Sequence, residues 1–79
     1  MTRPVKRSFS IDGHRTSISL EAAFWTALKN AAAEDRVTLA ALVASIDKGR
    51  GGSGLSSAVR VWLLERLSAR ANGSRNSAE

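Results

Sequence analysis

The segment from Arg15 to Leu20 alternates polar and apolar residues and then runs straight into an amphipathic helix at Glu21. Successive side chains of a strand point to opposite faces, so the alternation separates an aliphatic set from a polar set. The aliphatic face carries Thr16, Ile18 and Leu20, and the polar face carries Arg15, Ser17 and Ser19. A short strand that leads a helical chain needs a pairing strand from elsewhere. The guanidinium and hydroxyl groups suit the edges of bases, which indicates a strand paired across a dimer and laid against DNA.

The size and charge of the chain agree with this interpretation. With 79 residues, it is one domain near the lower limit for a self-sufficient core, so pairing with a second copy is expected. The absence of cysteine excludes disulfides and thiolate metal sites, and no apolar run approaches the roughly 20 residues of a membrane span. The net charge is +5, concentrated toward residues 1–15 and 50–79. This charge favours an anionic partner.

The dipeptide Asp12-Gly13 is a strong signal for a two-residue hairpin turn. If that turn forms, the apolar residues on both sides of it share one face of the hairpin, and the serines share the other. The facing residues are then Ile11 with His14 and Phe9 with Thr16. Alternatively, Gly13 is a bulge or bend in a longer extended arm.

Three helices are expected after the strand. The first carries Phe24, Trp25 and Leu28 at helical spacing and ends near residues 35–36. The second follows the capping residue Thr38 and runs to about Lys48, where a glycine-rich segment ends it. The third begins near residue 55. The expected organisation is a basic disordered arm at 1–7, a folded domain with its third helix at 8–70, and a disordered tail at 71–79.

The segment from Arg15 to Glu21 resembles the strand of the ribbon-helix-helix family of DNA-binding proteins, the MetJ and Arc type. It has a basic residue followed by small polar residues that alternate with aliphatic ones. A helix of about four turns, a short link at residues 36–37 and a Thr-capped second helix complete a resemblance that covers roughly residues 8–48. The stretch RSFSIDGHRTSISLEAAFWTALK is similar to small bacterial proteins described as ribbon-helix-helix domains.

The resemblance implies a mostly α fold with one short β-strand and an additional C-terminal helix. Two protomers would form an intertwined homodimer whose strands pair as an intermolecular antiparallel β-ribbon. Ribbon readers of this type lie in the major groove, which admits two strands. The implied base-contacting residues are Arg15, Ser17 and Ser19. The implied dimer core consists of Ile18, Leu20, Phe24, Leu28, Leu42, Val43, Ile46 and Trp62.

The resemblance also implies contacts to the DNA backbone. The start of the second helix presents free N–H groups, which bind phosphate well, and the basic arm can lie along the phosphates. The expected phosphate contacts are Thr38, Leu39, Ala40, Arg36, Arg3, Lys6 and Arg7.

The third helix leaves alternatives open. Trp62 and its neighbours are either extra core that covers the dimer, a tetramer contact, or a surface for a partner protein formed by residues 55–70. The segment GLSSAVRVWLLERL also resembles a second helix of the family, so an exchange of the second and third helices in register is a further alternative.

The residue types in the chain give little support for an enzymatic function. The chain has one histidine, no cysteine and no tyrosine, and its glycine run lacks the arrangement that cradles phosphates in nucleotide-binding loops. We therefore predict neither catalysis nor a cofactor or metal. The prediction is a bacterial, cytoplasmic and nucleoid-associated protein that binds double-stranded DNA sequence-specifically as a transcriptional repressor. The alternative is an antitoxin or another protein-interaction module that uses its C-terminal helix.

Overall fold

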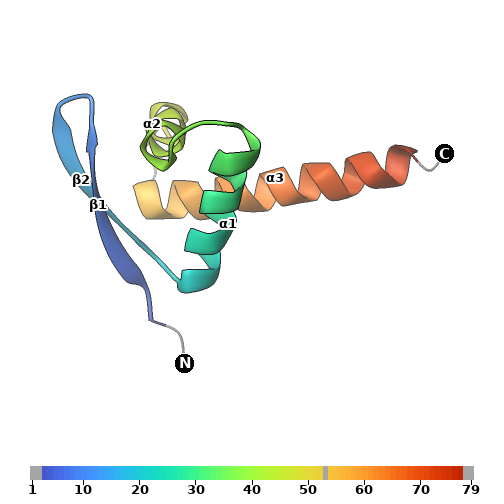
Figure 1. Cartoon of the computed structure of the whole chain (residues 1–79), viewed down its shortest axis with the longest axis horizontal. Helices are drawn as coiled ribbons and strands as arrows, with labels where there is room; N and C mark the ends of the chain where they lie inside the picture. Colours follow the sequence, from blue (N-terminus) through green and yellow to red (C-terminus); the bar gives the residue numbers. More distant parts are fainter. Residues whose placement is uncertain (1–2, 53, 78–79) are drawn as a thin grey trace.

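The computed structural model describes residues 3–52 and 54–77 of the chain. Two strands are followed by three helices in this part: β1 (Val5–Ile11), β2 (His14–Leu20), α1 (Ala22–Glu34), α2 (Leu39–Gly49) and α3 (Leu55–Ser77). The helices lie on one side of the two strands, and the long α3 extends away from them (Figure 1). One face of the strand pair is therefore covered by helices, and the other is not.

The two strands form an antiparallel hairpin. Asp12 and Gly13 at the turn both have positive φ, 52° and 80°, the backbone combination of the tight turn that matches the twist of a hairpin. Phe9 pairs with Thr16, and Ile11 pairs with His14. Both predicted pairs are confirmed, and the structure contains the hairpin rather than the alternative of a bulged arm.

The prediction of a single strand is wrong, because β2 pairs with β1 of the same chain. Residues 5–7, expected in a disordered arm, belong to β1. Trp25 holds them there, since its indole Nε1 donates a hydrogen bond to the Val5 carbonyl at 2.9 Å. The Arg7 guanidinium also lies 5.3 Å from the centroid of the Trp25 ring, within the range of a cation–π contact.

The predicted disordered tail is also corrected, because α3 continues to Ser77. Helix growth adds one hydrogen bond for each residue that is fixed. The strong helix formers Ala69, Arg70 and Ala71 therefore carry α3 past the predicted end at residue 70. Residues 1–2 of the predicted arm and 78–79 of the predicted tail lie outside the described residues.

The core of one chain lies between the hairpin and the helices. Most residues predicted as a dimer core are buried here without a second copy: Ile18, Leu20, Leu28, Leu42, Val43 and Ile46. The other two, Phe24 and Trp62, are half-buried against this core. Val59 and Leu63 bring α3 into the same cluster. A single chain thus buries its own apolar face, and a core shared between two chains stays a prediction.

The link between α1 and α2 contains a residue whose backbone is in the left-handed conformation. Arg36 has φ 57°. Its N–H donates to the Ala33 carbonyl at 3.2 Å, and the N–H of Val37 donates to the Ala32 carbonyl at 3.0 Å. These two bonds are the pattern that closes a helix with a left-handed residue. The Thr38 hydroxyl then accepts a hydrogen bond from the Ala41 N–H at 3.0 Å and caps α2, as predicted.

Candidate nucleic-acid interface

The face of the hairpin that points away from the core is polar. Side chains alternate between the faces along each strand, and the pairing brings together Lys6 with Ser19, Ser8 with Ser17, and Ser10 with Arg15. We call these six residues the hairpin polar face. Five of the six are exposed, and Ser19 is half-buried. The hydroxyl oxygens of Ser8 and Ser17 lie 3.4 Å apart at the centre of the face.

The charge on this face is entirely positive. Lys6 and Arg15 stand at opposite ends, and none of the six residues is acidic. Across the residues that the structure describes, neither Lys6 nor Arg15 forms an ion pair. Both side chains are therefore available to a ligand, and the hydroxyls between them can donate or accept hydrogen bonds.

Trp25 of α1 contacts β1 from the side of the core and holds the strand in position. The indole is buried and stacks on Phe9 with ring centroids 6.0 Å apart. Together with the hydrogen bond to Val5 and the contact with Arg7, the stacking attaches three inner residues of β1 to one side chain. A fixed inner face also fixes the outer one, because neighbouring residues of a strand point in opposite directions.

The end of β2 is attached to α3. The N–H of Ser19 donates to the Ser56 hydroxyl at 3.1 Å, and the Ser19 carbonyl accepts from Arg60 at 3.2 Å. Arg60 also forms an ion pair with Glu21 at 3.0 Å. The pKa of Glu21 lies below its usual range, first because its own backbone N–H donates to the carboxylate and then because Arg60 does. α3 thus covers the outer edge of β2 at Ser19.

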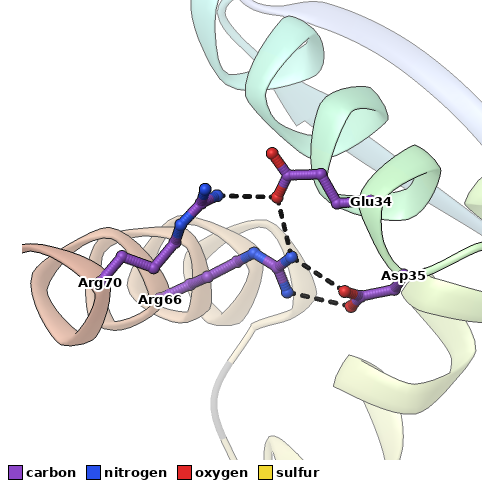
Figure 2. Close-up of polar contacts among 4 residues, drawn as sticks. All are labelled: Glu34, Asp35, Arg66 and Arg70. Atoms are coloured by element: carbon purple, nitrogen blue, oxygen red, sulfur yellow. Dashed lines mark hydrogen bonds and ion pairs between the residues drawn. The ribbon is translucent and has the colours of Figure 1, made fainter. Parts of the chain in front are cut away.

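Two arginines of α3, Arg66 and Arg70, are paired with carboxylates of α1 and of the residue after it (Figure 2). Arg66 donates to both oxygens of Asp35, each at 2.9 Å, and to Glu34 at 3.0 Å. Arg70 donates to Glu34 at 2.7 Å. With Arg60 paired to Glu21 and Arg50 to Asp47, these four arginines do not form a free basic end. On the hairpin, by contrast, Lys6 and Arg15 form no ion pair with any described residue.

This network lowers the pKa of two carboxyl groups. The pKa of Glu34 falls below its usual value mainly because Arg66 and then Arg70 donate to it, and that of Asp35 falls mainly because Arg66 does. Reciprocally, Asp35 and then Glu34 raise the pKa of Arg66. Such carboxylates stabilise the folded chain above their unfolded pKa, about 4, and the contribution is lost as pH falls through the lower folded pKa.

We therefore expect the stability of the chain to fall below about pH 4, and to fall less steeply in Arg66→Gln, because that substitution removes the partner that lowers both pKa values. Urea unfolding followed by circular dichroism at a series of pH values measures this. Lys29→Gln is the control, since Lys29 is an exposed cation of α1 that forms no ion pair with any described residue. Parallel pH profiles for the wild type and Arg66→Gln would contradict the assignment.

The predicted phosphate contacts at α2 lie together at its start. Thr38 and Ala40 are exposed, Leu39 is half-buried, and Arg36 is exposed beside them. The N–H groups of Leu39 and Ala40 have no acceptor among the described residues. The opposite end of α2 lies by the hairpin turn, where Asp47 and Arg50 line one hollow with Ile11 and Arg15. The start of α2 is therefore the end that is farther from the turn.

The three predicted arm contacts separate in the structure. Lys6 belongs to the hairpin polar face, and Arg3 is exposed before β1 begins. Arg7 lies on the inner face with its guanidinium over Trp25, but it is exposed, so its contact with a phosphate stays a prediction. The alternation of strand side chains decides this difference, because residues 6 and 7 are neighbours.

The ribbon-helix-helix domain matches residues 4–67, which include both strands, α1, α2 and most of α3. The chain belongs to the ribbon-helix-helix domain family. No curated protein and no solved structure matched the chain. The family match begins before β1, so it covers the hairpin as a whole and not only the strand that leads into α1.

Two residues of the hairpin polar face, Ser8 and Ser10, are absent from the predicted contacts. The signal that finds them is the alternation across Asp12-Gly13, which already places both serines on the same face as Arg15 once the turn forms. The predicted base contacts come from β2 alone, because the hairpin was one of two alternatives for residues 8–14.

The described part of this ribbon-helix-helix chain contains no helix that is both long and apolar enough to cross a membrane. Its described side chains also include no cluster of three or more metal-ligating residues. The hairpin polar face combines exposed hydroxyl groups with two cations that form no ion pair with any described residue.

Proposed function

We propose that the chain is a non-catalytic, sequence-specific DNA-binding protein that represses transcription as a homodimer, in the cytoplasm and on the nucleoid. The observation that carries this proposal is the hairpin polar face on the side of a two-stranded ribbon opposite the core. It has four hydroxyls and two cations that form no ion pair with any described residue. Membership of the ribbon-helix-helix family, whose members generally bind DNA as dimers, supports the same function.

The major groove admits a two-stranded ribbon, which is the form of this hairpin. A two-stranded ribbon fits a groove about 12 Å wide and 8.5 Å deep, and the helices leave this ribbon uncovered on one side (Figure 1). Arg15 can donate two hydrogen bonds to the O6 and N7 atoms of guanine. Ser17 and Ser19 can donate or accept, so they add weaker preferences. Among these residues of β2, we expect Arg15 to contribute most to base recognition.

Backbone contacts supply much of the affinity in this proposal. The free N–H groups of Leu39 and Ala40, together with Thr38, bind one phosphate at the positive end of the α2 dipole. Arg36, beside the start of α2, and Arg3, before β1, are exposed and add positive charge for contacts to the DNA backbone. Because phosphate contacts release counterions, the affinity falls steeply with salt.

The dimer contact that we propose is a row of apolar residues on α3. Val61, Leu64 and Leu67 are 52%, 65% and 55% exposed, and their spacing places them on one side of the helix. An exposed apolar row on a chain of this size marks an interaction surface. A second copy of α3 can cover it by packing row against row.

The first test selects bound fragments from genomic DNA with the purified chain and then compares variants on a selected site. We expect Arg15→Ala to weaken binding to that site by about 5-fold to 100-fold, the range of one bidentate contact to guanine. Lys29→Ala removes an exposed charge from α1 and should change affinity little. Equal affinity of Arg15→Ala and the wild type would overturn the base-reading role, and the absence of any bound fragment at low salt would overturn DNA binding.

The second test concerns the dimer. We expect the wild type to sediment with the mass of two chains and Leu64→Glu to sediment as one chain, because a buried carboxylate without a partner strongly opposes association. Ala69→Glu adds the same charge on another side of α3 and should stay dimeric. A Leu64→Glu variant that remains dimeric would place the contact elsewhere.

The same exposed row supports a second candidate, a protein-interaction module in which residues 55–70 bind a partner protein, as in an antitoxin. Sedimentation separates the two candidates. A wild type that sediments as one chain at all concentrations leaves the row open for a different partner, whereas a wild-type dimer broken by Leu64→Glu assigns the row to a second copy.

A further inference from the structure

The two strands of the hairpin repeat one sequence pattern. β1 contains Lys6-Arg7-Ser8-Phe9-Ser10-Ile11, and the last six residues of β2 are Arg15-Thr16-Ser17-Ile18-Ser19-Leu20. Each run has a cation at its first position, serines at its third and fifth, and apolar residues at its fourth and sixth. In the direction of the chain, the outward residues of each strand therefore read cation, serine, serine.

The pairing register turns this repeat into an approximate two-fold symmetry. Ser8 pairs with Ser17 at the centre, and the outer pairs are Lys6 with Ser19 and Ser10 with Arg15. A half-turn about an axis between the central serines exchanges the strands, because they are antiparallel. It places each outward residue of β1 on the residue of the same kind in β2, with a cation at each end of the face.

This arrangement is the one that two identical strands form when they pair antiparallel. If two copies of β2 paired about Ser17, each Arg15 would face the Ser19 of the other strand. In the hairpin, Arg15 faces Ser10, and Lys6 faces Ser19. β1 thus takes the place of the second copy of β2, with Lys6, Ser8 and Ser10 in the roles of cation, first serine and second serine.

The other edge of β2 is closed to a second strand where such a ribbon would need it. In this register Ser19 directs its N–H and carbonyl away from β1, and α3 occupies both groups through Ser56 and Arg60. Arg60 is itself held by Glu21. An intermolecular β2–β2 ribbon would have to break these bonds, whereas the pairing of β2 with β1 leaves them in place.

We infer that one chain forms a complete groove-reading ribbon, in which Lys6, Ser8 and Ser10 read bases on one side of a local centre and Arg15, Ser17 and Ser19 read bases on the other. The inference rests on the proposed DNA-binding function and deepens it. Lys6 and Arg15 can both bind guanine through O6 and N7. Each hairpin therefore recognises a short inverted pattern with one guanine preference from each cation.

The test repeats the selection of DNA fragments with Lys6→Ala and with Arg15→Ala, and compares base preferences within the footprint of one hairpin. We expect each variant to lose one guanine preference and to keep the symmetry-related one, with affinity for the wild-type site lowered by about 5-fold to 100-fold. Ser8→Ala and Ser17→Ala should weaken preferences beside the centre. All four residues are exposed, so the variants should fold, which circular dichroism checks.

A ribbon made of two β2 strands gives a different result. Arg15→Ala would then abolish both symmetric preferences at once, and Lys6→Ala would abolish neither. That outcome, or a Lys6→Ala variant that weakens binding to all sequences equally as a phosphate contact does, overturns the inference while the proposed function stands. If the wild type selects no DNA, the proposed function fails and the inference fails with it.

Discussion

Replacing Trp25 with alanine is expected to lower the free energy of unfolding by about 3–5 kcal/mol, the usual cost of deleting a buried tryptophan. The indole is only 3% exposed. The substitution removes its packing against Phe9, its hydrogen bond to the Val5 carbonyl and its contact with Arg7. Domains of this kind have free energies of unfolding of about 5–15 kcal/mol, so a large part of the stability depends on this residue.

Urea unfolding followed by circular dichroism measures the effect, with two variants for comparison. Trp25→Phe keeps an aromatic ring beside Phe9 and loses the Nε1 donor, so we expect a smaller loss that includes the roughly 1 kcal/mol of one hydrogen bond. Trp62→Ala removes the half-buried tryptophan of α3 and should cost less than Trp25→Ala. If Trp62→Ala is the more destabilising variant, Trp25 does not attach β1 to the core.

Replacing Gly13 with valine is expected to disrupt the hairpin and abolish specific DNA binding. Gly13 has φ 80° with open space around the Cβ position, so backbone strain rather than a clash opposes a side chain. An L-residue in the left-handed region costs about 1–2 kcal/mol, and a β-branched one is an outlier there. The strain falls on the turn that sets the register of the strands, and a slip of one residue would turn the polar side chains toward the core.

Gly51→Val is the matched control for this prediction. Gly51 also has a positive φ, 63°, and open space around its Cβ position, but it lies between α2 and α3. We expect both variants to lose a similar amount of stability in urea unfolding, and only Gly13→Val to lose affinity for a selected DNA site in fluorescence anisotropy. Equal losses of affinity would show that general stability, rather than the hairpin, controls binding.

The local features of the fold could be predicted from the residues that form them. The alternation of residues 15–20, the Asp12-Gly13 turn and the Thr38 cap each depend on neighbours within a few positions, and the structure contains all three. The pairing of Phe9 with Thr16 follows from the length of the turn alone. The family resemblance placed on these residues agrees with the domain matched over residues 4–67.

The errors occurred where distant contacts decide the outcome. The basic residues at 5–7 have the composition of an arm, but β2 and Trp25 make them a strand. The arginines of α3 read as a free positive end, but the packing of α3 against α1 places Arg66 between Glu34 and Asp35 (Figure 2). Composition cannot predict such pairing, because ion pairs depend on which helix faces come together.

The sequence by itself determined which side chains share a face of the hairpin, because strand alternation and a two-residue turn are local properties of the chain. The tertiary structure decided which surfaces stay available. It closed the edge of β2 at Ser19 with α3, neutralised Arg60, Arg66 and Arg70, and left Lys6 and Arg15 without ion pairs among the described residues. These outcomes require residues more than 30 positions apart to meet, and only the packing of the helices on the hairpin brings them together.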